Sequence, residues 1–467
     1  MNTSLGVIFG NRDFFPDHLV SEARQDILAL FKEMNIETVM LGENETKLGS
    51  VETYAHAKAC ADLFKANRDR IEGILVVLPN FGDEKGVADT IKLSGLNVPI
   101  LVQAYPDNLE AFNVERRRDA FCGKVSVCNN LSQYGYQFSL TSLHTSVPTS
   151  EAFKKDLRKF VSVCHTVKGL RSARLGAIGA RPGAFNTVRY SEKILQASGI
   201  TVTTVDLSEI LGDSVRLSDD APSVKAKLEE IHAYAKHDTV PSPAIVRMAK
   251  LGVVISDWMQ ANDLQATALQ CWTSIQKNYG INACTLMSMM SNQLMPSACE
   301  TDITGVVSMY ALQLASNFPG ALVDWNNNYA DDPDRCVLFH CGNWAKSFIP
   351  DIEIKTAPIL GTTLGEENTY GAMAGRAAAG PMTYARVSTD DTSGIIRAYT
   401  GEGELTNDPL DTFGQRAVVY TPNLQKLLAY ICRNRFEHHV AMTMGNVAGA
   451  LDEAFTNYMG WENYNHS

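Results

Sequence analysis

The sequence contains no C-x-x-C pair, although its 467 residues include 10 cysteines. Cysteine pairs at this spacing mark zinc ribbons and thioredoxin-like redox motifs, so neither class is indicated. No uninterrupted apolar stretch approaches the roughly 20 residues that are needed to cross a bilayer. We therefore expect most cysteines to be reduced core residues of a protein without a membrane span.

Positive charge is also scarce, because 41 lysines and arginines stand against 52 aspartates and glutamates and leave a net charge of −11. An acidic protein is not attracted to nucleic acid or to an anionic membrane surface, so neither is the expected partner. The short apolar run that ends at Asn11 has no basic region before it and is too short for a signal peptide. These absences predict a cytoplasmic protein that acts on a small molecule.

Hydrophobic residues make up 45% of the chain and charged residues 20%, which is ordinary for a globular protein. The length favours two to four domains. Between residues 5 and 104, short runs such as GILVVLP alternate with stretches of helical periodicity such as AHAKACADLFKANRDR. This alternation is typical of βαβ units and predicts an open, doubly wound parallel sheet.

A second alternation follows the stretch TSEAFKKDLRKFVSVCHTVKGL, which predicts a helix capped near Thr149 or Ser150. From about residue 355, glycine- and threonine-rich runs such as GPMTYARVSTDD indicate successive antiparallel strands.

The predicted fold class is therefore α/β. Two doubly wound, Rossmann-like α/β domains at 1–168 and 169–352 are followed by a smaller, β-rich, barrel-like domain at 353–467.

The glycine-rich stretch GAIGARPGAF, at 176–185, follows a predicted strand. Its spacing is not G-x-G-x-x-G, and it lacks the lysine of a P-loop. We expect a turn between a strand and a helix rather than a phosphate loop, with Arg181 and Arg189 as candidates for facing a ligand.

Four separate segments carry side chains that can bind a metal ion at the edge of an apolar run. They are Glu300 in PSACETDITG, Asp324 in ALVDWNN, His340 in LFHCGNWA, and His438 and His439 in EHHVA. Each residue alone also fits a structural role, since a glutamate near a helix N-terminus often just complements the helix dipole. Together, however, these oxygen and nitrogen ligands fit a site for manganese or another divalent ion better than they fit a zinc site that is built from thiolates.

The same four segments resemble the L-fucose isomerase and L-arabinose isomerase superfamily, and the order of domains is similar over nearly the full chain. The resemblance implies a metal-dependent aldose–ketose isomerase that holds Mn²⁺, Co²⁺ or Mg²⁺ through Glu300, Asp324 and His439. The two carboxylates would also move protons. His340 corresponds to a further histidine ligand of the arabinose type, whereas glutamate followed by aspartate is similar to the fucose type. His340 and His438 are thus expected either to bind the ion or to orient one of its ligands.

The chemistry of such an isomerase needs these residue types. A proton moves between C1 and C2 of the sugar through a cis-enediol, and the charge that develops on O1 and O2 must be stabilised. Carboxylates beside these atoms can accept and return the protons.

The resemblance further implies a substrate pocket completed by the N-terminal domain of a neighbouring subunit, and hence a homo-oligomer, either a trimer or a hexamer. Arg12 would then hold sugar hydroxyls or an anionic group, and Asn343, Trp344 and Trp325 are further candidates for contact with the sugar. The candidate substrates are L-fucose, L-arabinose and a C6-modified hexose such as the sulfonated sugar sulfoquinovose.

Two other classes of protein fit part of the sequence. Two successive α/β domains also build sugar-binding proteins without catalysis, but this interpretation explains neither the β-rich third domain nor the cluster of carboxylates and histidines. A nucleotide-dependent dehydrogenase or kinase would rest on the glycine-rich stretch alone, since no lysine or ribose-binding acid stands at the expected place.

Overall fold

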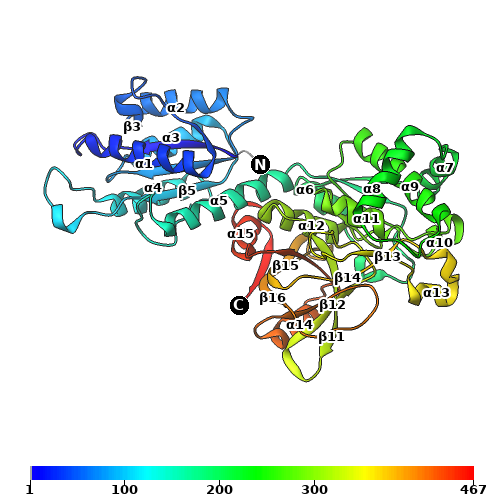
Figure 1. Cartoon of the computed structure of the whole chain (residues 1–467). Coiled ribbons are helices and arrows are strands. Elements are labelled where there is room, and N and C mark those ends of the chain that lie inside the picture. The colour runs from blue at the N-terminus through cyan, green and yellow to red at the C-terminus, as the bar shows by residue number, and fades with distance from the viewer. Residues whose placement is uncertain (1–2) are drawn as a thin grey trace. The chain divides into compact units, whose positions relative to one another are not determined.

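The computed structural model describes residues 3–467, which divide into two compact units (Figure 1). Among the described residues, the first unit comprises 3–168 together with 456–460, and the second comprises 169–455 together with 461–467. None of the helices in the described part of the chain combines the length and the hydropathy that a membrane crossing requires.

The first unit is built on a parallel sheet with the strand order β2-β1-β4-β5-β6, and β3 also pairs with β1. Its strands are β1 (Thr3–Gly10), β2 (Ile36–Val39), β3 (Ser50–Val51), β4 (Gly73–Leu78), β5 (Ile100–Ala104) and β6 (Ser139–Leu140). Its helices are α1 (His18–Met34), α2 (Tyr54–Ala66), α3 (Glu84–Ser94), α4 (Ala120–Gln133) and α5 (Glu151–Leu170), of which α5 runs into the second unit.

Helices cover both faces of this sheet. Leu5, Val7 and Phe9 of β1 pack with α1 and α5 on one face, whereas Ile8 packs with α2, α3 and α4 on the other. Successive side chains of a strand point to opposite faces, so both sets are buried and the strand reads as a continuous apolar run. This burial on two sides explains why the parallel sheet could be predicted from the sequence.

The predicted cap of α5 is confirmed. The Ser150 hydroxyl accepts a hydrogen bond from the backbone N–H of Phe153 at 3.3 Å, and the helix begins at Glu151. Such a cap satisfies one of the free N–H groups in the first turn.

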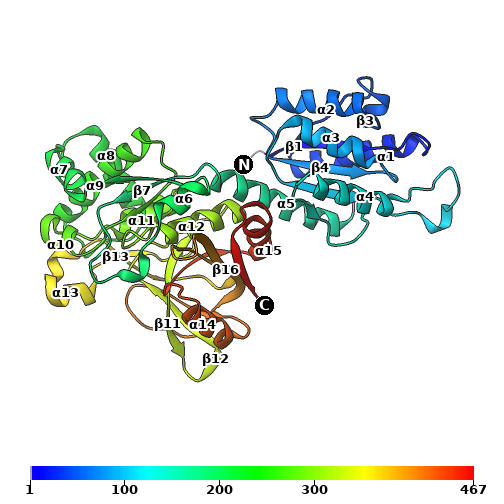
Figure 2. The same ribbon diagram turned by 180° about the vertical axis from the view of Figure 1, so that it is seen from behind.

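The second unit contains a parallel sheet with the strand order β10-β9-β7-β8. Its strands are β7 (Arg174–Ile178), β8 (Thr201–Val205), β9 (Ala266–Leu269) and β10 (Ser297–Ala298). The helices that follow these strands or connect them are α6 (Glu192–Ala197), α7 (Leu207–Arg216), α8 (Pro222–Tyr234), α9 (Ser242–Ala261), α10 (Ser274–Tyr279), α11 (Cys284–Asn292) and α12 (Ile303–Ser316). Helices α7 and α8 both pack against α9, as can be followed in Figure 2.

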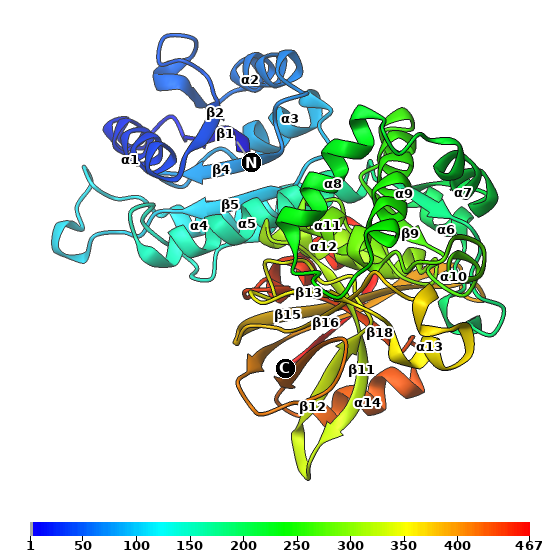
Figure 3. The same ribbon diagram turned by 45° about the vertical axis from the view of Figure 1, so that its right-hand side comes forward.

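The rest of the second unit is a mixed sheet of nine strands (Figure 3). They are β11 (Ala321–Tyr329), β12 (Asp332–His340), β13 (Glu353–Lys355), β14 (Ala372–Arg376), β15 (Gly380–Asp390), β16 (Ile395–Thr406), β17 (Gln415–Tyr420), β18 (His439–Met444) and β19 (Glu462–His466). Its helices are α13 (Pro358–Leu364), α14 (Leu424–Arg433) and α15 (Ala448–Glu453). Antiparallel pairing in the order β17-β12-β11-β18-β15-β16, and back to β17, closes six of these strands into a ring.

The expectation of parallel α/β sheets followed by a β-rich part is confirmed, but one pair of strands lies elsewhere than predicted. Strands β11 and β12, which fall within the predicted second α/β domain at 169–352, are antiparallel neighbours in the mixed sheet. The chain turns back between them at Ala330, whose φ of +49° lies in the left-handed region. The parallel sheet and the mixed sheet of this unit also share one hydrophobic core.

The glycine-rich stretch 176–185 forms the end of β7 and a loop, and α6 begins only at Glu192. Gly179 has a φ of +78°, and a Cβ at this position would lie 2.5 Å from Oε1 of Gln270. Arg181 donates to Asn186 Oδ1 at 3.2 Å, and Arg189 Nε donates to the carbonyl of Asn186 at 3.1 Å. Both arginines are thus engaged within their own loop.

Candidate metal and active site

Strands from both sheets of the second unit deliver the predicted metal ligands to one place. Glu300 follows β10 of the parallel sheet, Asp324 lies in β11, His340 ends β12 and His439 begins β18. Strand β11 lies between β12 and β18, and the register of β11 with β18 sets Asp324 directly opposite His439. Directly opposed residues on neighbouring antiparallel strands present their side chains on the same face.

The ligand atoms converge without hydrogen bonding to one another. His439 Nε2 lies 3.6 Å from Glu300 Oε2 and 3.6 Å from Asp324 Oδ1, and His340 Nε2 lies 3.8 Å from the same Glu300 oxygen. Both carboxylate oxygens are buried and have no hydrogen-bond partner. Ligands that hold one divalent ion at about 2.1 Å lie about 3 to 4 Å from each other. The residues present therefore fit a divalent cation.

A buried network behind His439 fixes the orientation of its ring. His439 Nδ1 lies 2.9 Å from Asp302 Oδ2, and Arg386 donates to the two oxygens of Asp302 at 2.6 and 3.0 Å. Arg386 also pairs with Glu437 at 3.0 Å. Burial alone would raise the pKa of Asp302, but Arg386 and His439 hold it below its usual range. A hydrogen bond from Nδ1 to a carboxylate leaves Nε2 free for an ion.

Asp302 has two roles. Its side chain caps α12 by accepting from the backbone N–H of Gly305 at 2.8 Å. Its contact with Arg386, which is 84 positions away, carried no local signal.

Glu300 is buried and has a strained backbone. Glu300 and Thr301 both have a φ of +55°, a region that residues other than glycine rarely adopt. Trp272 Nε1 donates to Glu300 Oε1 at 2.8 Å, which leaves Oε2 as the free oxygen. Burial raises the pKa of the Glu300 carboxyl, although His340 and His439 oppose this effect. A carboxyl group with a raised pKa and a free oxygen is suited to accept and return a proton.

His340 is enclosed on its other side by sulfur. Its Nδ1 lies 3.6 Å from Cys299 Sγ and 3.7 Å from Cys341 Sγ. Burial alone would lower the pKa of His340, but Cys341 and Glu300 outweigh burial and raise it to about 10. The ring can therefore face the carboxylate with a proton on Nε2, or turn the same nitrogen toward an ion.

His438 lies at the rim of the cluster. Its side chain is 43% exposed, and its Nε2 is 3.7 Å from Asp324 Oδ1. Burial and the neighbouring His439 lower the pKa of His438 to about 4, so the ring is neutral at pH 7. A neutral imidazole beside Asp324 can donate a hydrogen bond or bind an ion.

A cavity of about 200 Å³ opens on the cluster. Its walls are Phe185, Trp272, Glu300, Asp324, Phe339, His340, Cys341, Thr356, Ala357, Pro358, Ile359, Leu360, Ala372, Met373, Phe413, Gly414, His438 and His439. Acidic and imidazole groups thus lie beside apolar and aromatic walls. Among the described residues that line the cavity there is no arginine or lysine.

Three of the predicted sugar contacts do not line this cavity. Trp344 is 0% exposed and packs against Phe348, so the expectation that it contacts a sugar is replaced by a role in the core. Asn343 is also fully buried, and its Oδ1 accepts from the backbone N–H of Leu322, which holds β11 in place. Trp325 donates from Nε1 to a tyrosine hydroxyl inside the second unit. The sequence around a residue does not show whether a side chain near the end of a strand is buried in the core or lines a cavity.

Arg12 lies in the first unit, just after β1, as predicted. Its Nε donates to the carbonyl of Gly82 at 3.0 Å, it pairs with Glu84, and its guanidinium lies 4.3 Å from the ring centre of Phe81. Its own unit therefore holds the side chain in one place, with 20% of it exposed.

Replacing Asp302 by asparagine is expected to weaken Mn²⁺ binding by about 10- to 100-fold, because His439 loses the charged acceptor that orients it. The free energy of unfolding should fall by about 3 kcal/mol, since Arg386 keeps only one of its two buried carboxylate partners. Isothermal titration with Mn²⁺ and denaturant unfolding measure the two effects.

Asp206→Asn is the matched control, because Asp206 caps α7 in the same way but is exposed. It should change the free energy of unfolding by about 1 kcal/mol or less and leave Mn²⁺ binding as it is. Equal Mn²⁺ affinity in Asp302→Asn and in the unaltered protein would contradict the orienting role.

Comparisons with known proteins found two family models and several relatives that match this chain. Residues 6–171 match the family model of the fucose/sulfoquinovose isomerase N-terminal domain, and residues 338–466 match that of the L-fucose isomerase C-terminal domain. A sulfoquinovose isomerase of Priestia aryabhattai is 24% identical over 347 residues, which are 72% of this chain and 74% of that protein. A sulfoquinovose isomerase of Alkalicoccus urumqiensis is 27% identical over 207 residues, 43% of this chain and 45% of that protein.

A solved periplasmic solute binding protein from Actinobacillus succinogenes 130z with bound D-allose covers 67% of this chain and 92% of its own, at 8% identity. Its TM-score of 0.17 is too low to carry an argument. The two matched models frame the segment that holds Glu300 and Asp324, and the second contains His340 and His439. The predicted resemblance is thereby confirmed, and the chain belongs to the fucose isomerase-like superfamily.

Proposed function

We propose that the protein interconverts an aldose and its ketose, and that its substrate is a C6-modified hexose, sulfoquinovose. The observation that carries this proposal is the pair of buried, unpartnered carboxylate oxygens, on Glu300 and Asp324, that meet at His439 Nε2. The similarity to sulfoquinovose isomerases supports the choice of sugar.

Glu300, Asp324 and His439 are the residues that would hold a divalent cation, for which Mn²⁺ is our choice. Two carboxylates and one imidazole are hard and borderline ligands, which suit Mn²⁺, Co²⁺ or Mg²⁺. When bound, such an ion supplies a Lewis acid that stabilises negative charge on O1 and O2 of the sugar.

The side chains of the cavity carry the protons. Glu300 and Asp324 act as the acid and base groups, one exchanging a proton with carbon and the other with the sugar oxygens. Burial raises the pKa of Glu300 and so favours its protonated form more than water would, which suits a group that both accepts and returns a proton. The walls formed by Phe185, Trp272 and Phe339 limit the access of water to the intermediate.

A panel of aldoses, assayed with Mn²⁺ and scored for ketose formation, tests this function. We expect sulfoquinovose to be converted with the highest kcat/KM, and L-fucose and L-arabinose less efficiently or not at all. The absence of ketose from every sugar in the panel, with metal content verified, would reject the proposal.

A sulfonate needs a cationic partner, and the described lining of the cavity contains no arginine or lysine. We assign this role to Arg12 of a neighbouring subunit, so the active protein should be a trimer or a hexamer. Light scattering coupled to gel filtration measures the mass. An active monomer would count against both the shared pocket and the role of Arg12.

Replacing His340 by asparagine is expected to lower turnover by about tenfold and to leave the bound Mn²⁺ in place, because a glutamate followed by an aspartate is similar to the fucose type, in which His340 would orient a ligand or a sugar hydroxyl rather than bind the ion. Metal analysis by mass spectrometry, together with steady-state kinetics, measures both. Loss of the ion in His340→Asn would instead identify His340 as a ligand of the arabinose type.

A further inference from the structure

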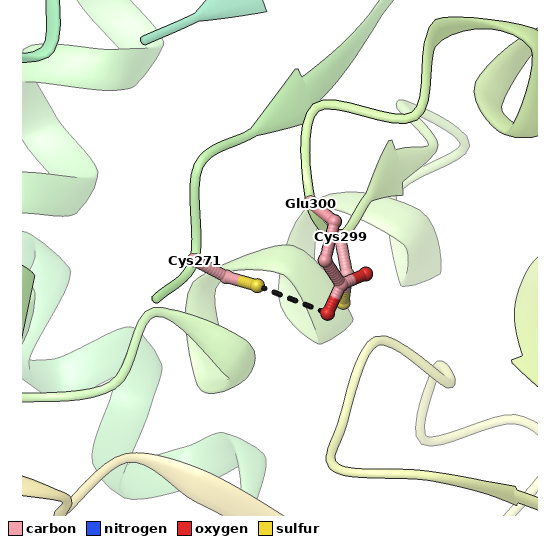
Figure 4. Close-up of side chains that lie close together, drawn as sticks. All are labelled: Cys271, Cys299 and Glu300. Atoms are coloured by element: carbon pink, nitrogen blue, oxygen red, sulfur yellow. Dashed lines mark hydrogen bonds between the residues drawn. The ribbon is translucent and has the colours of Figure 1, made fainter. Parts of the chain in front are cut away.

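Two buried cysteines, Cys271 and Cys299, lie beside Glu300. Cys271 and Cys299 follow the neighbouring parallel strands β9 and β10, and the carboxyl ends of parallel neighbours meet at the same edge of a sheet. Figure 4 shows both thiols next to the Glu300 carboxylate. The two sulfur atoms and a carboxylate oxygen all lie within 4.8 Å of one another, and all three residues are buried.

This group shares the Glu300 carboxylate with the proposed Mn²⁺ site but uses its other oxygen. Cys271 Sγ lies 3.5 Å from Glu300 Oε1, whereas Glu300 Oε2 is the oxygen that faces His439. His340 Nδ1 lies 3.6 Å from Cys299 Sγ, so an imidazole nitrogen borders the same group.

The donor set and its spacing fit a thiophilic ion. Two cysteines with a carboxylate and a nearby imidazole favour Zn²⁺ or Cd²⁺ over Mn²⁺, because sulfur is a soft ligand. Around a tetrahedral zinc with Zn–S of about 2.3 Å and Zn–O of about 2.0 Å, a sulfur and an oxygen lie about 3.5 Å apart. The distance between Cys271 Sγ and Glu300 Oε1 is 3.5 Å.

We propose that Cys271, Cys299 and Oε1 of Glu300 form a second cation site, for a thiophilic divalent ion such as Zn²⁺ or Cd²⁺, and that an ion in this site inhibits the enzyme. Binding replaces the two S–H protons, which pass to solvent, by two metal–sulfur bonds, and no electron is transferred. Trp272 Nε1 then loses Oε1 as its acceptor. The inhibitory part rests on the proposed function, because Glu300 bound to the second ion no longer serves as an acid or base.

Titration with Cd²⁺ in the presence of saturating Mn²⁺ tests the site, because cadmium–thiolate bonds absorb in the ultraviolet. One tight equivalent per chain is expected in the unaltered protein. Its affinity should fall by at least about 100-fold in Cys271→Ser and in Cys299→Ser. Cys336→Ser is the matched control, since Cys336 is a buried thiol of β12 in the same unit, and it should keep the tight equivalent. The proposal would be overturned if the ultraviolet cadmium–thiolate absorption, and the Cd²⁺ affinity that it reports, were unchanged in both Cys271→Ser and Cys299→Ser.

Crystals of the unaltered protein soaked in Cd²⁺ make the result independent of how the variants fold. An anomalous peak is expected between the two sulfurs, and its absence at saturating Cd²⁺ would overturn the site. Neither readout needs turnover, so both decide the site even if no sugar is converted.

The inhibitory role is tested on active enzyme. Turnover should fall as the cadmium–thiolate absorption rises, and Cys271→Ser should need at least about tenfold more Cd²⁺ for the same fractional loss of turnover. Full turnover with the cadmium–thiolate absorption saturated would reject the inhibitory role.

Discussion

Exhaustive treatment with EDTA is expected to abolish turnover and to lower the thermal midpoint, and Mn²⁺ is expected to restore both. Glu300 Oε2 and Asp324 Oδ1 are buried without hydrogen-bond partners, so removal of the ion leaves two uncompensated acceptors at the floor of the cavity. An ion present at a hundredfold excess over its Kd stabilises the folded state by about 2.7 kcal/mol, and that stabilisation is lost with the ion. Differential scanning calorimetry and the ketose assay, on samples whose metal content is known, measure the two effects.

The variant His439→Gln serves as the control for this experiment. It removes the nitrogen at which both carboxylates meet, so the thermal midpoint should no longer rise on addition of Mn²⁺. Full turnover of the unaltered chain with no detectable divalent metal would rule out the proposed mechanism.

Glu300→Gln is expected to lower kcat by at least about 100-fold, the usual scale for removal of a general base. Glutamine keeps the size of the side chain and an oxygen that can accept from Trp272 Nε1, so the local structure should be preserved. What is lost is the negative charge and the group that takes the proton. Steady-state kinetics with the converted sugar, together with the thermal midpoint, separate loss of chemistry from loss of fold.

Glu404→Gln is the matched control, because Glu404 is an exposed glutamate of β16 in the same unit. It should keep turnover within about a factor of two, as expected for a surface substitution. Turnover of Glu300→Gln close to that of this control would remove the basis of the proposed function.

Much of the fold could be predicted because local patterns reflect it. Strand β1 is buried on both faces and is therefore one apolar run in the sequence, and Ser150 is a recognisable N-cap residue for α5. The segments of Glu300, Asp324, His340 and His439 could also be selected from the sequence, since each sets a metal-capable side chain at the edge of an apolar run. These signals are short-range, and burial and hydrogen bonding within a few residues produce them.

Pairing between distant segments was decided only by the tertiary structure. The register of β11 with both β12 and β18 brings Asp324 to His439, and a strand pattern does not specify its neighbours. Arg386 reaches Asp302 across 84 positions. The thiols of Cys271 and Cys299 meet at Glu300 because β9 and β10 are parallel neighbours. The metal-capable residues of the site could therefore be identified from the sequence. The electrostatics of the site, in contrast, arise from long-range contacts that form only when the two sheets of the second unit share one core.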